Sequence, residues 1–185
     1  MADLGRPGTW LHRGDQLIYD SAWVRLVTAD VVMPDGTQVD HHVVRMPSEA
    51  AGTILIDCGR VLMLYRHRFI TDTWGWEIPA GAVDLGETIE QAARRETLEE
   101  SGWEPTTVQH LCSFHPANGI LDQTFHIFTS FDAEHRGEPT DRNEAAKIEW
   151  HSFGEVRSMF MAGQITDGLS FGALGYAFTA GSLDG

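Results

Sequence analysis

The chain has 185 residues with 42% apolar side chains, which suits one domain with a hydrophobic core. Its 27 acidic residues outnumber 13 lysines and arginines, and the formal net charge of −14 argues against nucleic acid and anionic membranes as partners. We expect a cytoplasmic protein. The sequence shows neither a signal peptide nor an apolar run of roughly 18 residues, and its two cysteines, Cys58 and Cys112, are far apart.

The first part of the chain predicts paired strands. Residues 17–33 and 38–46 are rich in valine, isoleucine and aromatic residues, and Pro34-Asp35-Gly36 between them is a turn signal. We therefore expect a small antiparallel sheet within residues 1–46. A second hairpin and a further short strand are predicted over residues 53–56, 60–65 and 76–78.

The clearest helix signal lies at residues 87–101. Thr88 or Glu87 can open the helix, and Gly102 is a natural stop. Good helix formers fill the stretch between them. An apolar stripe along this helix is formed by Ile89, Ala92, Ala93 and Leu98.

Strands dominate again after this helix, and two helices close the chain. The further strands are predicted over residues 107–115, 123–131 and 147–151, and a polar loop over 134–144. The last helices are predicted over 154–162 and 167–179, the second capped by Asp167. Strands mixed with three helices indicate an α+β fold.

Carboxylates crowd the predicted helix and the turn before it, namely Asp84, Glu87, Glu96, Glu99 and Glu100. Glu96 and Glu100 are four residues apart and therefore share one helix face. Unpaired carboxylates stacked in this way repel one another, and a hard divalent cation with oxygen ligands would relieve the repulsion. The alternative, a solvated charged helix face, does not explain the glycines before and after the cluster.

The stretch from Gly81 to Trp103, GAVDLGETIEQAARRETLEESGW, resembles the Nudix box, G-x5-E-x7-R-E-U-x-E-E-x-G-U, in which U is bulky and apolar. Every charged and glycine position matches. The departures are Thr97 at the first U position and the aromatic Trp103 at the last. The resemblance implies a Nudix α/β/α sandwich with a mixed central sheet over residues 47–185, preceded by the small N-terminal sheet.

Segments outside the box resemble the ADP-ribose pyrophosphatase group of this family. They read YDSAWVRLVTADVVMPDGTQVDHHVV, VLMLYRHRF, WGWEIPAG and HPANGILDQTFHIF. The opening strands of that group exchange across a homodimer, so the resemblance implies a homodimer held by residues 1–46. Gln123 departs from the group, which has a glutamate at this place.

The resemblance also implies a Mg²⁺ or Mn²⁺ site made of oxygen ligands. Its ligands would come from four residues, the carbonyl oxygen of Ala80 and the carboxylates of Glu96, Glu99 and Glu100. Glu87 would orient Arg95 and the neighbouring loop in support of this site, rather than carry out the hydrolysis.

The expected catalytic carboxylates are Glu144, as a general base on the polar loop, and Glu99. Glu138 and Glu149 are lesser candidates for the base. The role of Glu77, as a core-edge acid or a ligand contact, stays open.

The expected substrate contacts are Arg68, Trp23 and Gln123. The guanidinium of Arg68 would bind a phosphate, and Trp23 would stack on adenine. A strand-end salt bridge for Arg68 and simple packing for Trp23 remain as alternatives.

The resemblance implies metal-dependent hydrolysis of a nucleoside diphosphate linked to a second moiety, with ADP-ribose cleaved to AMP and ribose 5-phosphate. The altered residue at Gln123 leaves room for ADP-glucose or GDP-mannose instead. A non-catalytic nucleotide-sensing Nudix module is a rival from another class. It is disfavoured because all four box glutamates are present.

Overall fold

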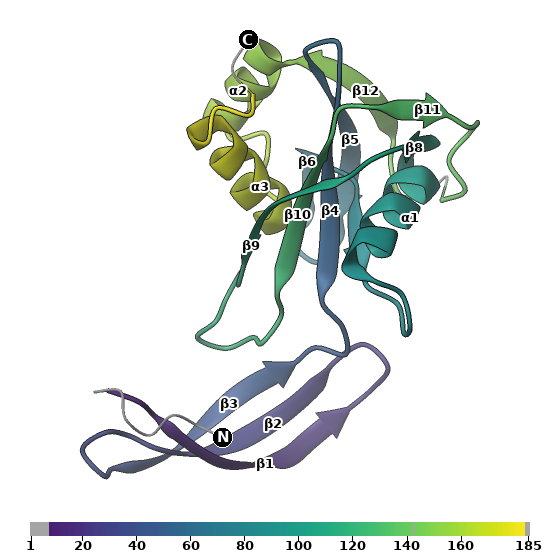
Figure 1. Ribbon diagram of the computed structural model, residues 1–185. Coiled ribbons are helices and arrows are strands. Elements are labelled where there is room, and N and C mark those ends of the chain that lie inside the picture. The colour runs from purple at the N-terminus through teal and green to yellow at the C-terminus, as the bar shows by residue number, and fades with distance from the viewer. Residues whose placement is uncertain (1–7, 142, 184–185) are drawn as a thin grey trace. The chain divides into compact units, whose positions relative to one another are not determined.

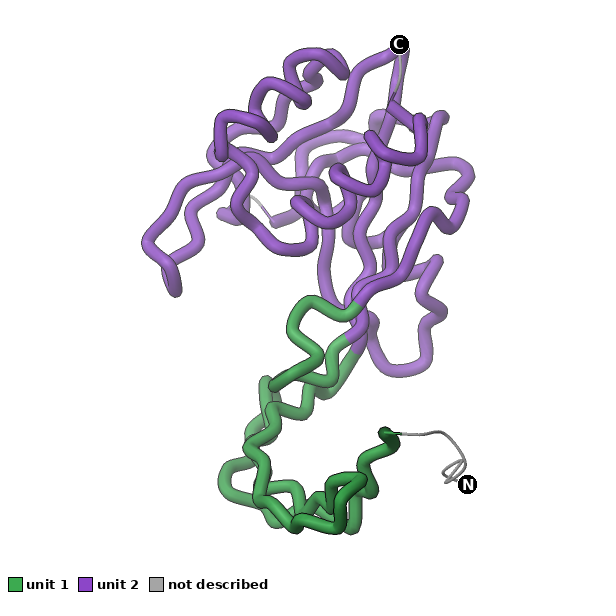
Figure 2. Tube along the Cα trace, turned by 90° about the vertical axis from the view of Figure 1, so that its left-hand side faces the viewer, with its two compact units in different colours: residues 1–48, 115–123 green, residues 49–114, 124–185 purple. Residues whose placement is uncertain are grey.

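The structure, a computed structural model, describes residues 8–141 and 143–183 (Figure 1). The contacts within the chain divide it into two compact units (Figure 2). The first comprises residues up to Ser48 and the segment His115–Gln123, and the second comprises Glu49–Phe114 and the residues from Thr124 onward. Because compactness does not test whether a unit folds alone, the domain boundary expected at residue 46 stays a prediction.

The first unit is built on a three-stranded antiparallel sheet. Its strands, in spatial order, are β1 Leu11–Asp20, β2 Arg25–Val32 and β3 Gln38–Arg45. The predicted Pro34-Asp35-Gly36 turn joins β2 to β3, and the Asp35 carboxylate accepts from the Thr37 amide at 2.9 Å. The inserted segment runs beside β3, where the Val44 amide donates to the Ile120 carbonyl at 2.8 Å.

The segment expected as one strand over residues 17–33 is instead two strands separated by a turn. The Ser21 hydroxyl accepts from the amides of Trp23 and Val24, both at 3.2 Å. A serine that bonds its own neighbouring backbone in this way competes with the strand ladder and stabilises a turn. Ala22, Trp23 and Val24 follow Ser21 directly, so the apolar composition of the segment did not reveal the turn.

The second unit contains a seven-stranded mixed sheet. Five strands form a continuous path in the order β12, β5, β4, β10 and β9, while β6 pairs with β5 and β7 pairs with β4. Among the described strands of this sheet, only β4 and β10 pair in parallel. The strands are β4 Ala50–Asp57, β5 Arg60–Arg68, β6 Thr73–Glu77, β7 Ala80–Ala82, β9 Gln109–Phe114, β10 Phe125–Ser130 and β12 Lys147–Ser152.

Helices cover both faces of this sheet (Figure 1). Helix α1 Ile89–Ser101 packs Ala92 and Ala93 against Phe128 on one face. Helices α2 Phe153–Met161 and α3 Gly168–Thr179 enclose the larger core on the other. The predicted α/β/α sandwich with a mixed sheet is therefore confirmed. Among the described helices, none is both long and apolar enough to cross a membrane.

Local signals define the ends of α1 as the sequence predicted. Thr88 caps the start, where its hydroxyl accepts from the Gln91 amide and the Gln91 side chain accepts from the Thr88 amide. Gly102 ends the helix in the left-handed conformation at φ 76°, and its amide donates to the Leu98 carbonyl at 2.8 Å. These caps fix which turn of the helix carries each box carboxylate.

The polar loop expected over residues 134–144 begins later than predicted. Its first residues belong to β11 Ala133–His135, which pairs with β8 Trp103–Pro105 immediately after α1. This short ribbon brings the start of the loop back to the end of α1, where the Arg136 amide donates to the Gly102 carbonyl at 2.9 Å. The pairing joins segments about thirty residues apart, which explains why local composition did not reveal it.

Replacement of Gly102 by alanine is expected to destabilise the second unit. A Cβ at this position would overlap the Gly137 carbonyl oxygen, and the φ of 76° is unfavourable for any residue with a side chain. We expect a loss of about 2–4 kcal/mol in the free energy of unfolding, measured by urea denaturation.

Gly163→Ala is the matched control for this substitution. Gly163 also has a positive φ, 71°, but a Cβ there would meet no atom within 4 Å. The control should therefore lose only about 1 kcal/mol, which is the conformational cost alone. Equal losses in the two variants would contradict the predicted overlap with Gly137.

Candidate active site

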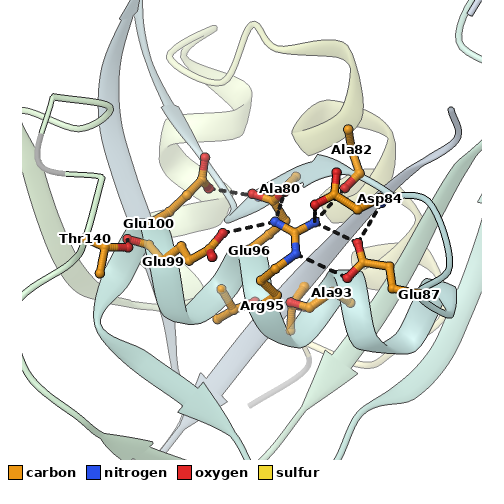
Figure 3. A network of polar contacts seen from close by, with 12 residues as sticks. Ala80, Ala82, Asp84, Glu87, Ala93, Arg95, Glu96, Glu99, Glu100 and Thr140 are labelled. Atoms are coloured by element: carbon orange, nitrogen blue, oxygen red, sulfur yellow. Dashed lines mark hydrogen bonds and ion pairs between the residues drawn. The ribbon is translucent and has the colours of Figure 1, made fainter. Parts of the chain in front are cut away.

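Arg95 lies at the centre of the acidic cluster (Figure 3). Its Nη1 donates to Glu96 at 2.7 Å and to Glu99 at 3.0 Å, and its Nε and Nη2 bind the two oxygens of Glu87 at 3.2 and 2.7 Å. Nη2 also donates to the Ala82 carbonyl at 2.8 Å. One guanidinium thus holds three carboxylates and the loop before α1 together, and the hydrogen bond from Arg95 lowers the pKa of Glu87.

Glu96 lies against the backbone at Gly81. A Cβ at Gly81 would overlap the Glu96 carboxyl group, so only glycine permits this approach. Burial raises the pKa of Glu96, although the hydrogen bond from Arg95 acts in the opposite direction. The first glycine of the predicted box therefore has a direct structural role, because it brings a partly desolvated carboxylate to the Ala80–Gly81 peptide.

Glu100 is buried, with a 3% exposed fraction, between two donors. Arg66 Nη1 donates to one oxygen at 2.9 Å, and the Ala80 amide donates to the other at 3.0 Å. Burial raises the pKa of Glu100 to about 7 in spite of these bonds. The carboxylate is thus desolvated more than its two partners compensate.

Glu144 reaches the same guanidinium from the loop. Arg66 Nη1 donates to Glu144 at 3.0 Å as well as to Glu100, so one nitrogen bridges the two carboxylates. Backbone hydrogen bonds anchor the loop on both sides of Glu144. The Asp141 amide donates to the Glu99 carbonyl at 3.2 Å, and the Ala146 amide donates to the Tyr65 carbonyl at 2.8 Å. The side chain of Glu144 is about half exposed, so it remains accessible to solvent.

Arg66 is the site residue that the sequence analysis missed. Only 2% of it is exposed, and it also lies 3.6 Å from a Glu77 oxygen. A signal was present, because Arg66 follows Leu62 and Leu64 at the two-residue spacing of one strand face. A charged residue on the buried face of a strand needs a partner, and here the partners are distant in sequence.

Arg68, the predicted phosphate contact, makes a two-point ion pair with Glu77. Its Nε donates to one Glu77 oxygen at 3.0 Å and its Nη2 to the other at 2.5 Å. Glu77 is buried and the guanidinium of Arg68 is about half exposed. Burial raises the pKa of Glu77, and Arg68 opposes this effect. Of the two roles left open for Glu77, its contacts match that of an acid at the edge of the core, where it binds Arg68.

Trp23 and Gln123 lie in the first unit. Trp23 is 83% exposed in the turn between β1 and β2, so it is not packed in a core within the described residues. Gln123 ends the inserted segment, and its carbonyl lies 3.4 Å from His115 Nδ1. The other predicted site residues all belong to the second unit. Figure 3 shows Ala80, Glu87, Arg95, Glu96, Glu99 and Glu100 beside α1, from the turn before the helix to its last turn. Arg66 Nη1 joins Glu144 to Glu100 in this group. Glu138 and Glu149 are exposed, and neither contacts these residues in the described hydrogen bonds.

The donor chemistry of this cluster fits a hard divalent cation. The available donors are carboxylate and carbonyl oxygens, and both Glu96 and Glu100 are desolvated without full compensation. Within the described residues, no three acidic, histidine or cysteine side chains converge on one point, since Arg95 holds Glu96 and Glu99 while Arg66 holds Glu100. A cation would therefore compete with guanidinium groups for these oxygens.

The geometry can be set beside known proteins. A family model described as "NUDIX domain" matches residues 46–167, more than half of the chain. The chain belongs to the Nudix family. The predicted Nudix pyrophosphohydrolase that resembles ADP-ribose pyrophosphatases is confirmed.

Two relatives and one solved structure illustrate the likeness. A CMP-5'-(N-acetyl-N-hydroxy-3-aminopropyl)phosphonate hydrolase of Streptomyces rubellomurinus is 39% identical over 89% of this chain and 81% of its own. An ADP-ribose pyrophosphatase of Mycobacterium tuberculosis is 28% identical over 84% of this chain and 76% of its own. The structure of an ADP compounds hydrolase has a TM-score of 0.82 at 15% identity, over 95% of this chain and 96% of that one, and so supports the fold.

Replacement of Arg66 by methionine is expected to destabilise this Nudix domain strongly. The change would leave Glu100 buried without its cationic partner, whereas Glu77 would keep its ion pair with Arg68. Breaking a buried pair in this way costs about 3–5 kcal/mol. Urea denaturation measures the loss.

Arg60→Met serves as the control, because Arg60 makes a half-exposed ion pair with Asp57 at 3.3 Å. Such a surface pair contributes about 0–1 kcal/mol, so the control should unfold nearly as the parent does. If Arg66→Met unfolds at the same urea concentration as the control, the buried charges are not compensated by Arg66.

Proposed function

We propose that this Nudix enzyme hydrolyses, with a divalent metal ion, the phosphoanhydride bond of a nucleoside diphosphate linked to a second moiety. Its preferred substrate is ADP-ribose, which yields AMP and ribose 5-phosphate. One observation supports the proposal above all. The last two turns of α1 present Glu96 and Glu100 against the Ala80–Gly81 peptide, and Glu99 shares Arg95 with Glu96. An anchored loop brings a further carboxylate, Glu144, to the Arg66 nitrogen that binds Glu100.

The metal, Mg²⁺ or Mn²⁺, would be held by Glu96, Glu99, Glu100 and the carbonyl oxygen of Ala80. When bound, such an ion neutralises substrate charge and acidifies a coordinated water. Arg95 keeps Glu96 and Glu99 side by side in its absence, and Glu87 keeps Arg95 in place through two hydrogen bonds. Glu87 and Arg95 are thus proposed to support the ligands rather than to bind metal.

Glu144 is proposed to act as the general base, with Glu99 as the second catalytic carboxylate. The bond from Arg66 holds one Glu144 oxygen, while the half-exposed side chain can accept a proton from water at its other oxygen. The loop anchors at Asp141 and Ala146 limit how far this carboxylate can move. Arg68, Trp23 and Gln123 are the proposed substrate contacts.

A CMP-linked phosphonate is the second candidate substrate. The observation that favours it is the 39% identity, over most of both chains, to the hydrolase named for such a compound. The same carboxylates and guanidinium groups would serve either substrate, because both candidates join a nucleoside 5′-phosphoryl group to a second phosphorus. Selection between them then depends on contacts to the two organic ends of the substrate.

The first unit is proposed to form a homodimer in the cytoplasm through residues 1–46. Val27 and Ala29 are the only buried apolar side chains among the described residues of this three-stranded sheet, so it has little core of its own. Large apolar side chains are also exposed in β1, just before it and in the turn after it, namely Trp10, Leu11, Leu17, Ile18, Tyr19 and Trp23. A second copy of the chain would cover such a surface.

Amidation of the proposed ligands should separate metal-binding residues from supporting ones. Glu96→Gln and Glu100→Gln should each lower kcat/KM by about a thousandfold or more, because each removes an anionic oxygen donor. Glu87→Gln should lower it less, since Glu87 acts on Arg95 instead. Steady-state assays with saturating Mg²⁺ measure these kcat/KM values. If Glu87→Gln loses the most activity of the three variants, the assignment of metal ligands and supporting residues is reversed.

Metal removal and a substrate panel test the reaction itself. Chelator should abolish turnover, and added Mg²⁺ or Mn²⁺ should restore it. We expect kcat/KM for ADP-ribose to exceed that for ADP-glucose, GDP-mannose and a CMP-linked phosphonate, read as released nucleoside monophosphate. A tenfold preference for the phosphonate would establish the second candidate, and no turnover of any compound would favour a sensing module.

Light scattering at about micromolar concentration should give twice the chain mass, because the exposed apolar side chains of β1 require cover. The double substitution Leu17→Lys and Ile18→Lys should shift the protein towards the monomer. The matching pair on another surface, Met161→Lys and Phe171→Lys, should leave the mass unchanged. A parent protein that is monomeric under these conditions would refute the dimer.

A further inference from the structure

Three polar side chains meet at one edge of the seven-stranded sheet, on strands that the proposed reaction does not use. Ser113 and His110 belong to the edge strand β9, and His126 belongs to β10 beside it. Ser113 is the register partner of His126, and His110 is the partner of Phe128 two residues further along β10. Side chains on neighbouring antiparallel strands come within contact distance when they are opposite or diagonal to one another.

The two imidazole rings converge on the Ser113 hydroxyl. His110 Nε2 and His126 Nδ1 each lie 2.8 Å from Ser113 Oγ. A serine hydroxyl carries a single proton, so it can donate to only one of the two rings and must accept from the other. Either nitrogen can instead offer its lone pair to a cation when the ring carries its proton on the opposite nitrogen. Two potential nitrogen ligands therefore surround one point.

The spacing of these atoms suits a transition metal ion. Bonds of about 2.0–2.1 Å to such an ion place neighbouring ligands roughly 3.0–3.4 Å apart. The observed separations of 2.8 Å are slightly shorter, so a small outward rotation of the exposed His110 side chain would admit the ion. Imidazole ligands favour zinc, copper and nickel, whereas oxygen ligands favour magnesium. The two histidines thus select a different class of metal from the carboxylates at α1.

Glu49 lies on the opposite side of the His126 ring. His126 Nε2 is 3.5 Å from a Glu49 carboxylate oxygen, and this buried nitrogen makes no hydrogen bond among the described residues. Histidines that bind metals commonly donate their second N–H to a carboxylate, which fixes the tautomer and the ring orientation. A cation on Nδ1 would require the proton on Nε2 and would polarise that N–H towards Glu49. The buried nitrogen would then gain the partner that it lacks.

The surroundings hold the rings in place and leave the hydroxyl accessible. The His110 ring packs edge-on against Phe128, with ring centres 5.6 Å apart, and Phe128 is buried against α1. The side chain of His126 is only 15% exposed. Ser113 and His110, in contrast, are exposed, so an ion can reach them from solvent and complete its coordination with water.

We propose that His110 and His126 form a transition-metal site, separate from the carboxylate cluster, that binds a divalent ion of the zinc class. The Ser113 hydroxyl and water complete the coordination, and Glu49 orients His126. Since no three histidine, cysteine or acidic side chains converge within the described part of the chain, the ion is exchangeable rather than permanently enclosed. A bound ion joins the edge strand β9 to β10. The site is independent of the proposed hydrolysis.

Titration of the full chain with Zn²⁺ tests this site. Calorimetry in a large excess of Mg²⁺, which competes for the carboxylate cluster, should show Zn²⁺ binding to the parent. Loss of a carboxylate that orients a histidine ligand lowers metal affinity by about 10–100-fold, so Glu49→Gln should weaken binding by about tenfold. His110→Ala and His126→Ala should weaken it at least as much, because each leaves a single imidazole.

Two further variants separate this site from other donors. His12→Ala is the matched control, because His12 also lies beside a carboxylate, that of Asp15 at 2.7 Å, but is outside the site. Glu100→Gln should likewise keep the parent's affinity for Zn²⁺ under these conditions, since Glu100 contacts Arg66 and Ala80 instead. Nuclear magnetic resonance should show shifted imidazole nitrogen signals for His110 and His126 on addition of Zn²⁺, and unchanged signals for His12.

Thermal melting with and without Zn²⁺ supplies a readout of stability. The ion should raise the melting temperature of the parent more than that of His110→Ala, because only a bound ligand stabilises the folded state. His110 is exposed, so this variant should fold even if the partly buried His126 cannot be replaced.

The site is wrong if the parent does not bind Zn²⁺, or if its affinity is unchanged in both His110→Ala and Glu49→Gln. Loss of binding in Glu100→Gln with none in His110→Ala would assign the ion to the carboxylates at α1 and would also overturn the site. An equal loss in His12→Ala and His110→Ala would indicate unspecific binding by surface histidines and count against it.

Discussion

The active-site region depends on the compensation of carboxylates by two guanidinium groups. Helix α1 carries Glu96, Glu99 and Glu100 within five residues, and Arg95 and Arg66 divide these acids between them. Arg95 neutralises the acids on the solvent side of the helix, whereas Arg66 neutralises the buried one. Buried charges are stable only when they are paired and hydrogen-bonded, so the position of each arginine determines where each carboxylate can lie.

The two arginines only partly offset the cost of burying the charges of Glu96 and Glu100. The raised pKa values of Glu96 and Glu100 show that burial opposes their charged forms even with an arginine present. A divalent cation supplies more positive charge than a shared guanidinium, and it would bind where that charge is lacking. The carboxylate and carbonyl oxygens of this region are donors of the kind that a hard divalent cation prefers.

Close backbone approaches determine how the catalytic elements meet. Gly81 lets the Glu96 carboxylate reach the peptide before the helix, and Gly102 lets the loop at Gly137 pass over its end. Because the same loop continues to Glu144, the helix end, the loop anchor and the Arg66 bridge act together on one carboxylate. The neighbouring hairpin tip, with Phe69 and Ile70, adds an apolar wall beside these charged groups.

The sequence by itself determined the parts of the molecule that depend on neighbouring residues. Thr88 and Gly102 define α1 through hydrogen bonds within one turn, and the spacing of Glu96 and Glu100 places them on one face, since helix geometry is local. Most strands of the sandwich could be predicted from composition, but β7, the turn at Ser21 and the β8–β11 pair could not. Only the tertiary structure decided that Arg66 joins Glu100 to Glu144, because these residues lie 34 and 78 positions away and a buried ion pair forms between side chains that folding brings together.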